Sequence, residues 1–466
     1  MQQVKRKLIP HRSEYKKNQP SKSKGTLSLG ELILIGVGGI VGAGFFLGVG
    51  SPIRTAGPSV LIAFLLGAFI TAQVTGAVTS IATHHPVEGS FKVYADLYLG
   101  HFAGYMQGWI YYVASVMTIA SEAVAMSVFT RVWLPNIPLW ILSLVYSAII
   151  LLINAFGVKN FGRVESFMSV IKIAALVGFI LFVGGALLFA HGSTANGLQL
   201  LGSSYNGFFP HGWSGVWQSM LIVVFAYAGI GVFATAAAEV RDVQEIERGA
   251  LWTILLLTLL YLISIGGVLL IEPWQSINTN TSPFVLALQH AGMPVLADIF
   301  NAVVLVASFS VMAGAVFSAN QILVSLGQDH EAPQFVTKMS RRNVPYGALA
   351  STAVGILIAI GAAYGLPANV YRFLISASSF MTFFYWFVML LTFVKWRRTE
   401  EGKKALASRL AFGSPFSTFV TMIAIGVLTV YALFQKDQRI AFYAFLVITM
   451  LIGGSYAFVR KRSSVK

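Results

Sequence analysis

Two ionisable side chains, Lys172 and Glu122, stand inside long apolar segments of the sequence and could exchange protons. Lys172 follows Arg163 by nine residues, so at 1.5 Å per residue a helix would place it about 13 Å from that basic end. Burying a charged lysine at this depth costs at least a few kcal/mol, so we expect either a partner or loss of the charge. Lys172 could then bind and release a proton; the alternative is a structural lysine that bonds to carbonyls or snorkels.

Glu122 precedes Arg131 by nine residues and is expected to lie equally deep. It could carry a proton or face the side chain of a substrate. A hydrogen-bonded structural acid on the inner face of a helix bundle fits the sequence equally well. Asp298 and Glu272 stand near the ends of apolar segments, where solvation is cheap, and we interpret them as interfacial.

Glycines interrupt two apolar segments, one through Gly42-Ala43-Gly44 and the other through Ala228-Gly229-Ile230-Gly231. Each glycine costs about 1 kcal/mol relative to alanine inside a helix, so these runs serve something other than stability. Close packing is one possible use, because Gly38 and Gly42 have the small-xxx-small spacing. Local unwinding is the other. It frees N–H groups that suit a carboxylate and C=O groups that suit an ammonium, and a free amino acid carries both.

The elements that must position these residues are transmembrane helices. Hydrophobic residues make up 56% of the 466 positions and charged residues 11%, so lipid must replace water around most of the chain. Segments of about 20 apolar residues can cross a bilayer, and they lack the period-two pattern of barrel strands. We predict an all-α polytopic membrane protein with twelve spans at residues 29–50, 58–82, 101–130, 137–156, 163–189, 214–238, 249–271, 296–326, 347–364, 370–394, 415–435 and 439–459.

The basic residues orient these spans. The two tails and the even-numbered loops hold 26 of the 32 Lys and Arg residues, whereas the opposite loops hold five. This bias predicts a multi-pass protein of the cell membrane with both termini in the cytosol and with loops 190–213 and 272–295 facing outward. Membrane orientation also explains the net charge of +15 better than nucleic-acid binding does. Residues 1–28 are polar and basic, so we expect a disordered cytosolic tail rather than a signal peptide.

The interrupted spans are the first and the sixth, which become equivalent if the chain contains two five-helix halves. Five is odd, so the halves have opposite topology, as in the inverted repeats of many transporters. We therefore predict repeats at 29–190 and 191–394, two further helices within 395–459, and a cytosolic tail at 460–466.

The order of several short motifs resembles the amino acid–polyamine–organocation superfamily, and within it the bacterial amino-acid permeases. Each motif is weak alone, but in this order they are specific. The resemblance covers nearly the whole chain after residue 25 and is carried by Gly36-Val37-Gly38-Gly39-Ile40-Val41-Gly42-Ala43-Gly44-Phe45-Phe46, Pro86-Val87-Glu88-Gly89-Ser90-Phe91, Gly104-Tyr105-Met106-Gln107-Gly108-Trp109, Asn154-Ala155-Phe156-Gly157-Val158-Lys159, Ile171-Lys172-Ile173, Val316-Phe317-Ser318, Ala332-Pro333 and Val344-Pro345.

The resemblance implies a five-plus-five inverted repeat plus two helices, with the substrate between the first and sixth spans. By position, the α-carboxylate would bind at Val41, Gly42, Ala43 and Gly44. The α-amino group would bind at Phe225, Ala226, Tyr227 and Ala228, where Phe225 would be a gating aromatic.

The resemblance also implies a lysine in the fifth span that touches the first and eighth spans in proton-coupled members. Lys172 matches that lysine, and Ser308 and Ser310 are candidates for the eighth-span side of the contact. Many relatives have an acidic residue where this chain has Gly231, which speaks against a cationic substrate.

Other chemistry finds little support in the sequence. Cysteine is absent, which excludes disulfides, cysteine-ligated metals and thiol nucleophiles. His84-His85 precedes a proline without a third ligand in register, and no phosphate-binding loop is present. We expect no enzyme activity, no metal and no cofactor.

Three functions compete. The leading hypothesis is uptake of a neutral amino acid, such as an aliphatic one, coupled to protons by alternating access. An exchanger on the same fold and a nutrient receptor that does not transport are the alternatives. A channel fits less well, because broken helices without a ring of charges are more typical of an occluding site.

Overall fold

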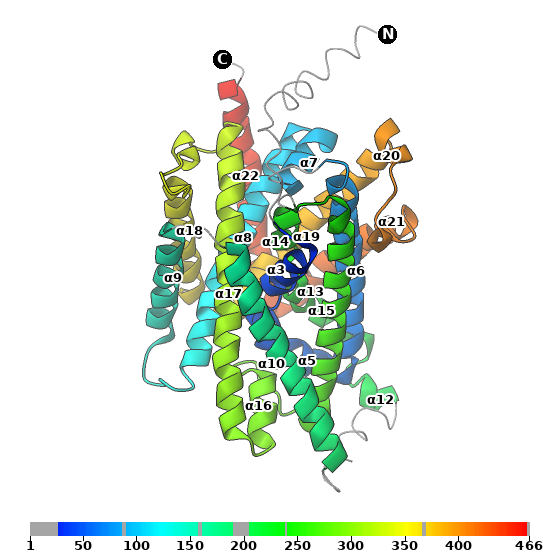
Figure 1. The fold of residues 1–466 in the computed structure, drawn as a ribbon, viewed down its shortest axis with the longest axis vertical. Coiled ribbons are helices and arrows are strands. Elements are labelled where there is room, and N and C mark those ends of the chain that lie inside the picture. Colours follow the sequence, from blue (N-terminus) through cyan, green and yellow to red (C-terminus); the bar gives the residue numbers. More distant parts are fainter. Residues whose placement is uncertain are drawn as a thin grey trace.

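A computed structural model describes residues 27–85, 90–156, 161–189, 205–237, 240–365 and 370–463 as a helical bundle (Figure 1). The expectations for residues 1–26 and 464–466 lie outside the described residues. The helices are α3 (Leu29–Ile40), α4 (Ala43–Phe46), α5 (Gly50–Ala56), η1 (Gly57–Ser59), α6 (Val60–Ala82), α7 (Ser90–Leu99), α8 (His101–Thr130), α9 (Leu139–Ala155), α10 (Phe161–Phe189), α12 (Tyr205–Phe208), α13 (Gly212–Tyr227), α14 (Ile230–Ala236), α15 (Gln244–Ile271), α16 (Pro283–His290), α17 (Pro294–Gln328), η3 (Gln334–Thr337), α18 (Tyr346–Tyr364), α19 (Val370–Arg397), α20 (Glu400–Lys404), η4 (Arg409–Ala411), α21 (Phe416–Tyr431), η5 (Ala432–Phe434) and α22 (Lys436–Ser463).

The apolar helices follow the segments expected from hydropathy. Among the described residues, ten helical segments are long and apolar enough to cross a membrane, and Leu29–Ile40 and Leu139–Ala155 are two shorter apolar helices. One of the ten, Ala43–Ala82, joins the second half of the expected first span to the second span. The helices overrun the apolar segments at several ends; α22, for example, continues to Ser463 through a stretch expected to be tail. The hydrogen bonds of a helix join backbone groups, so a helix can continue through polar residues beyond the lipid.

The bundle has a buried centre and an apolar outer surface. The central helices are α3, α8, α13, α14, α17 and α19, with α8 packed along α17 and α19. Peripheral helices expose large side chains such as Phe167, Leu181, Phe416, Met450 and Leu451, each at least two-thirds exposed. Apolar exposure on this scale requires lipid around the bundle, so the chain is a polytopic membrane protein.

The short connecting helices gather at opposite ends of the bundle. In Figure 1, α7 and α20 lie at the upper end, whereas α12 and α16 lie at the lower end. The segments that contain α7 and α20 carry many of the basic residues, and the segments that contain α12 and α16 carry none. The separation of these loops agrees with the alternation predicted from charge.

Main-chain contacts join the inner parts of the first and sixth spans. Before α3, Leu27 forms a parallel bridge with Val240, and the Arg241 N–H donates to the Leu27 carbonyl at 3.1 Å. Ser28 then caps α3 in a reciprocal arrangement with Glu31, which fixes where the helix begins. The start of α3 is thus held beside the chain that follows α14.

Candidate functional site

The first span is broken between Ile40 and Ala43. Val41 (φ −77°, ψ 99°) and Gly42 (φ −142°, ψ −158°) are both extended, so the helical hydrogen-bond ladder stops and restarts. The freed N–H of Ala43 donates to Oε2 of Glu122 at 3.0 Å. The Ala43 carbonyl accepts from the Tyr371 hydroxyl at 2.8 Å. The break therefore presents a main-chain donor that a carboxylate already uses.

The helix of the sixth span is disrupted less than that of the first. α13 ends at Tyr227 and α14 begins at Ile230, with Ala228 still near helical angles and its N–H bonded to the Phe225 carbonyl at 3.0 Å. Tyrosine hydroxyls donate to two carbonyls of this turn. Tyr261 donates to Ala226 at 3.0 Å and Tyr385 to Ala228 at 3.3 Å.

The two breaks face each other with their backbones in contact. A Cβ at Gly229 would lie 2.0 Å from the Gly39 carbonyl oxygen and 2.8 Å from Cα of Ile40. A Cβ at Gly44 would lie 2.7 Å from the ring of Phe225. The glycines therefore permit close packing at the same depth at which the helices are interrupted, so the two expected uses coexist.

A cavity of about 50 Å³ lies beside the breaks and is lined by residues of α3, α4, α8, α13, α14, α17 and α19. Its lining consists of Gly39, Ile40, Gly44, Tyr111, Ala114, Ser115, Thr118, Glu122, Phe225, Ala228, Gly229, Val232, Val311, Ala315, Ser318, Ser378, Thr382 and Tyr385. Of the residues predicted for the site, Gly44, Glu122, Phe225 and Ala228 line this cavity. The space is large enough for a few water molecules, so binding of a larger molecule requires the walls to move apart.

Other predicted substrate-site residues surround the cavity without lining it. Val41, Gly42, Ala43 and Ala226 are buried beside the breaks. The Tyr227 side chain turns to α6, where its hydroxyl donates to the Phe64 carbonyl at 3.3 Å. At Gly231 a Cβ would lie 2.3 Å from the Tyr111 hydroxyl, so a tyrosine from α8 takes the space that a side chain at this position would need.

Hydroxyl groups line the side of the cavity opposite the breaks. Thr118 of α8 and Ser378 of α19 lie 3.0 Å apart through their hydroxyl oxygens. Ser318 of α17 is 1% exposed, and its hydroxyl has no hydrogen-bond partner among the described residues. A buried hydroxyl without a partner is costly, so this wall can accept a hydrogen bond from a ligand or donate one to it.

Lys172 lies fully buried on α10, behind the break in the first span. Its ammonium donates to the Gly38 carbonyl of α3, and its Nζ lies 3.9 Å from Oε1 of Glu165. The Ser310 hydroxyl of α17 donates to the same Oε1 at 2.5 Å. The structure thus joins Lys172 to the first span directly and to the eighth span through Glu165. Ser308 is buried on α17 two residues before Ser310.

Glu165 was missed by the sequence reasoning, which treated the start of the fifth span as its solvated end. The carboxylate is 1% exposed. One signal was available: Glu165 and Lys172 are seven residues apart, and this spacing puts two side chains on the same face of a helix.

A second buried charge cluster ties α7 to the segment after α17. The Lys92 ammonium pairs with Asp329 and lies 2.9 Å from Oε2 of Glu331. Lys92 and Glu331 are almost fully buried. Burial opposes the charged form of Lys92, but the carboxylates of Glu331 and Asp329 outweigh it and raise the pKa of Lys92 above its ordinary value. Burial raises the pKa of Glu331, against the opposing effect of Lys92.

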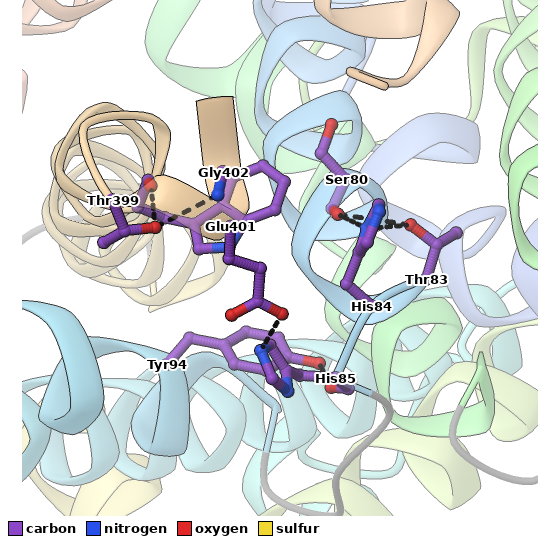
Figure 2. A network of polar contacts seen from close by, with 9 residues as sticks. Ser80, Thr83, His84, His85, Tyr94, Thr399, Glu401 and Gly402 are labelled. Atoms are coloured by element: carbon purple, nitrogen blue, oxygen red, sulfur yellow. Dashed lines mark hydrogen bonds and ion pairs between the residues drawn. The ribbon is translucent and has the colours of Figure 1, made fainter. Parts of the chain in front are cut away.

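His84 and His85 serve different partners (Figure 2). His84 Nδ1 lies 3.0 Å from the Ser80 carbonyl, whereas His85 Nε2 lies 2.7 Å from a carboxylate oxygen of Glu401. The Tyr94 hydroxyl donates to the His85 carbonyl at 2.6 Å. The pair thus connects the end of α6 with α7 and α20, and the two imidazoles do not converge on a shared point.

The two acids interpreted as interfacial lie near helix ends. Asp298 accepts a hydrogen bond from the Trp133 indole at 3.2 Å near the start of α17. Glu272, which follows α15, is 2% exposed and lies 2.7 Å from Nδ1 of His290. Glu272 is therefore held by a partner rather than by solvent.

Comparison with known proteins gives consistent matches over almost the full chain. A sequence model of the amino acid permease family matches residues 31–465. The gamma-aminobutyric acid permease of Bacillus subtilis (strain 168) is 32% identical over 446 residues, which cover 94% of each chain. The amino-acid permease AapA of the same organism is 32% identical, over 94% of this chain and 95% of its own. The aromatic amino acid transport protein AroP of Escherichia coli (strain K12) is 29% identical, over 92% and 94%.

Proposed function

This chain belongs to the amino acid permease family, and we propose that it is a secondary active transporter that couples uptake of a neutral amino acid to protons. The relatives carry names of amino-acid transport, which supports an amino acid as the substrate class and a transporter rather than an enzyme. The coupling ion, the charge of the substrate and the transport cycle belong to this proposal.

The single observation that carries the proposal is the hydrogen bond from the Ala43 N–H to Glu122. The break from Val41 to Gly44 holds a carboxylate there, and we propose that the α-carboxylate of the substrate binds at the same main-chain donors. Two ionised carboxylates at one donor repel each other strongly in a buried site. Substrate entry therefore requires Glu122 to take up a proton or to move away, and either event links binding to the protonation of Glu122.

The ammonium group of the substrate would bind at the break in the sixth span. The turn from Phe225 to Ala228 directs carbonyls to Tyr261 and Tyr385, whose hydroxyls hold these acceptors. An ammonium carries three donors and can replace such hydroxyls. Phe225, packed on Gly44, would then move when a substrate enters.

The cavity favours a neutral substrate side chain. Among the described residues that line it, Glu122 is the one acid and none is basic. Once Glu122 is protonated, no fixed charge remains there to pair with an ionised side chain. Tyr111 also fills the space beside Gly231, which leaves no room for an acid that could bind a cationic side chain.

Alternating access would use the proposed inverted repeat. The repeats comprise residues 29–190 and 191–394, followed by two helices within 395–459, which gives twelve spans with both termini in the cytosol of a cell-membrane protein. The half-helices of the first and sixth spans would rock against α8, α10 and α17, and so open the cavity to each side in turn. Lys172, with Ser308 and Ser310, would respond to this movement, because its ammonium bonds directly to the Gly38 carbonyl of α3.

Transport in proteoliposomes tests the proposal. A pH gradient should drive accumulation of a labelled neutral amino acid by the wild-type protein, and Lys172→Ala should abolish this accumulation. Loss of accumulation with exchange intact supports the coupling role of Lys172. Unchanged accumulation in Lys172→Ala would refute that role.

Two further outcomes separate the alternatives. Exchange by the wild-type protein with no response to a pH gradient would identify an exchanger. Binding without counterflow of labelled amino acid would identify a receptor. A thermal-shift screen of the purified protein against the standard amino acids selects the substrate for each experiment.

A further inference from the structure

The proton coupling proposed above involves Glu122 and Lys172, and a proton that passes from one to the other needs a group that receives it on the far side of Lys172. Glu165 lies there. It precedes Lys172 by two helical turns on α10 and follows Arg163, which stands at the end of α10 that we propose to be cytosolic. Glu122 lies on the other side, at the break in the first span, where it accepts a hydrogen bond from the Ala43 N–H.

The contacts of Glu165 differ from those of a surface acid. Its carboxylate is 1% exposed and has two described partners, the Lys172 ammonium at 3.9 Å and the Ser310 hydroxyl at 2.5 Å. A distance of 3.9 Å is longer than a charge-assisted hydrogen bond, which measures about 2.7–2.9 Å. The Lys172 ammonium instead bonds to the Gly38 carbonyl. A small displacement of α3 would release the ammonium and allow it to reach Glu165.

Gly38 makes this arrangement possible. A Cβ at that position would lie 2.6 Å from Oε1 of Glu165 and 1.9 Å from the hydroxyl of Ser169. The backbone of α3 therefore packs directly on the carboxylate, which is consequently shielded from water while α3 stays in place. If α3 withdraws, the carboxylate loses this cover first.

The helices packed against α10 bring no further ion pair to this site. These helices are α3, α15 and α17. Among the described residues, the one ion pair at this site joins Lys172 to Glu165, and Glu122 is the buried carboxylate at the break. The lysine is thus the one described cation placed to exchange a proton with either carboxylate.

We propose that Glu165 is the exit group for the transported proton on the side of Lys172 opposite the substrate. This inference rests on the proton coupling proposed above. When α3 moves, the N–H bond of the Lys172 ammonium breaks toward Glu165 and an O–H bond forms at Oε1, which leaves a neutral amine and a carboxylic acid. The acid then loses the proton to water, and the carboxylate returns to Ser310. The neutral amine can accept the next proton from Glu122.

The test compares Glu165→Gln with wild type in proteoliposomes, using pH-driven accumulation and equal-pH counterflow of the same labelled amino acid. The ratio of accumulation to counterflow should fall by at least about tenfold, because a glutamine cannot relay a proton. Glu165→Asp should restore part of the ratio. Ser310→Ala, which keeps the carboxylate, should displace the pH profile of accumulation and leave counterflow in place.

Glu272→Gln is the matched control, since Glu272 is equally buried and also paired but lies after α15, away from Lys172. It should leave the ratio unchanged. If wild type accumulates substrate and Glu165→Gln does so equally well, the exit role is refuted while proton coupling stands. Equal loss of both activities without recovery in Glu165→Asp would also refute it, as a purely structural effect. No pH-driven accumulation by wild type would instead refute the coupling itself.

Discussion

Replacing Gly229 with alanine is the sharpest test of the contact between the two breaks. The new Cβ would lie 2.0 Å from the Gly39 carbonyl oxygen, and real Cβ contacts essentially never fall below 3.0 Å, so the backbones must separate by at least 1.0 Å. The clash involves main-chain atoms on both sides, so no side-chain rotation relieves it. Overpacking of this kind costs about 1–3 kcal/mol. If the cost falls on the substrate-binding state, the affinity for substrate should decrease by about 5-fold to 150-fold.

The assay measures uptake and thermal stability of Gly229→Ala beside Gly178→Ala. Gly178 lies inside α10 with open space where its Cβ would be. Alanine there should keep uptake and add up to about 1 kcal/mol of helix stability. Substrate saturation curves separate an effect on affinity from an effect on the amount of folded protein.

Wild-type affinity in Gly229→Ala would refute the reasoning, because it would mean that the breaks do not touch in the state that binds substrate. An equal loss of substrate affinity in Gly178→Ala would also refute it. In that case any added methyl group would disturb the protein, and the contact at Gly229 would explain nothing.

Three further outcomes are expected. Tyr385→Phe removes the hydroxyl that the substrate ammonium would displace from the Ala228 carbonyl and should therefore lower the KM for uptake about fivefold, the equivalent of one hydrogen bond of about 1 kcal/mol. Ser318→Ala removes a buried hydroxyl that lacks a partner, so thermal unfolding should show no loss of stability, whereas a raised KM would show that the hydroxyl binds substrate. Lys92→Met leaves the buried Glu331 with His101, 3.3 Å away, as its one described cationic partner, and should destabilise the protein by about 3–5 kcal/mol. Burial raises the pKa of Glu331, so its carboxyl is protonated more readily in the folded protein as the pH falls, and a neutral acid is cheaper to bury. Thermal melts of the variant should therefore show a smaller loss of stability at pH 5 than at pH 8. An equal loss of stability at both pH values would contradict this.

The sequence allowed most of the helices to be predicted, because lipid imposes a length and a polarity on every span. It also located the two breaks, through the glycine runs Gly42-Ala43-Gly44 and Ala228-Gly229-Ile230-Gly231. That the first span is disrupted more than the sixth could not be predicted. Ala228 keeps helical angles, and the carbonyls of Ala226 and Ala228 accept hydrogen bonds from tyrosines that come from distant helices.

The partners that buried charged residues find on other helices could not be predicted either. Sequence reasoning placed Lys172 and Glu122 in the membrane, but hydropathy gives depth and not direction. The bond between Glu122 and Ala43 joins residues 79 positions apart, and its existence depends on how α8 is rotated. Glu165 was overlooked because its distance from the span end suggested solvent, whereas the absence of a side chain at Gly38 lets α3 cover it.

The bridge between Leu27 and Val240 has a mechanical consequence. The half-helices α3 and α14 are fastened to each other twice, by this bridge at one end and by the Gly39–Gly229 contact at the other. Two half-helices joined at both ends are expected to move together, because movement of either one alone would break a main-chain contact. In the proposed transport cycle, α3 and α14 would then open the cavity together, turning about Val41-Gly42 and Ala228-Gly229.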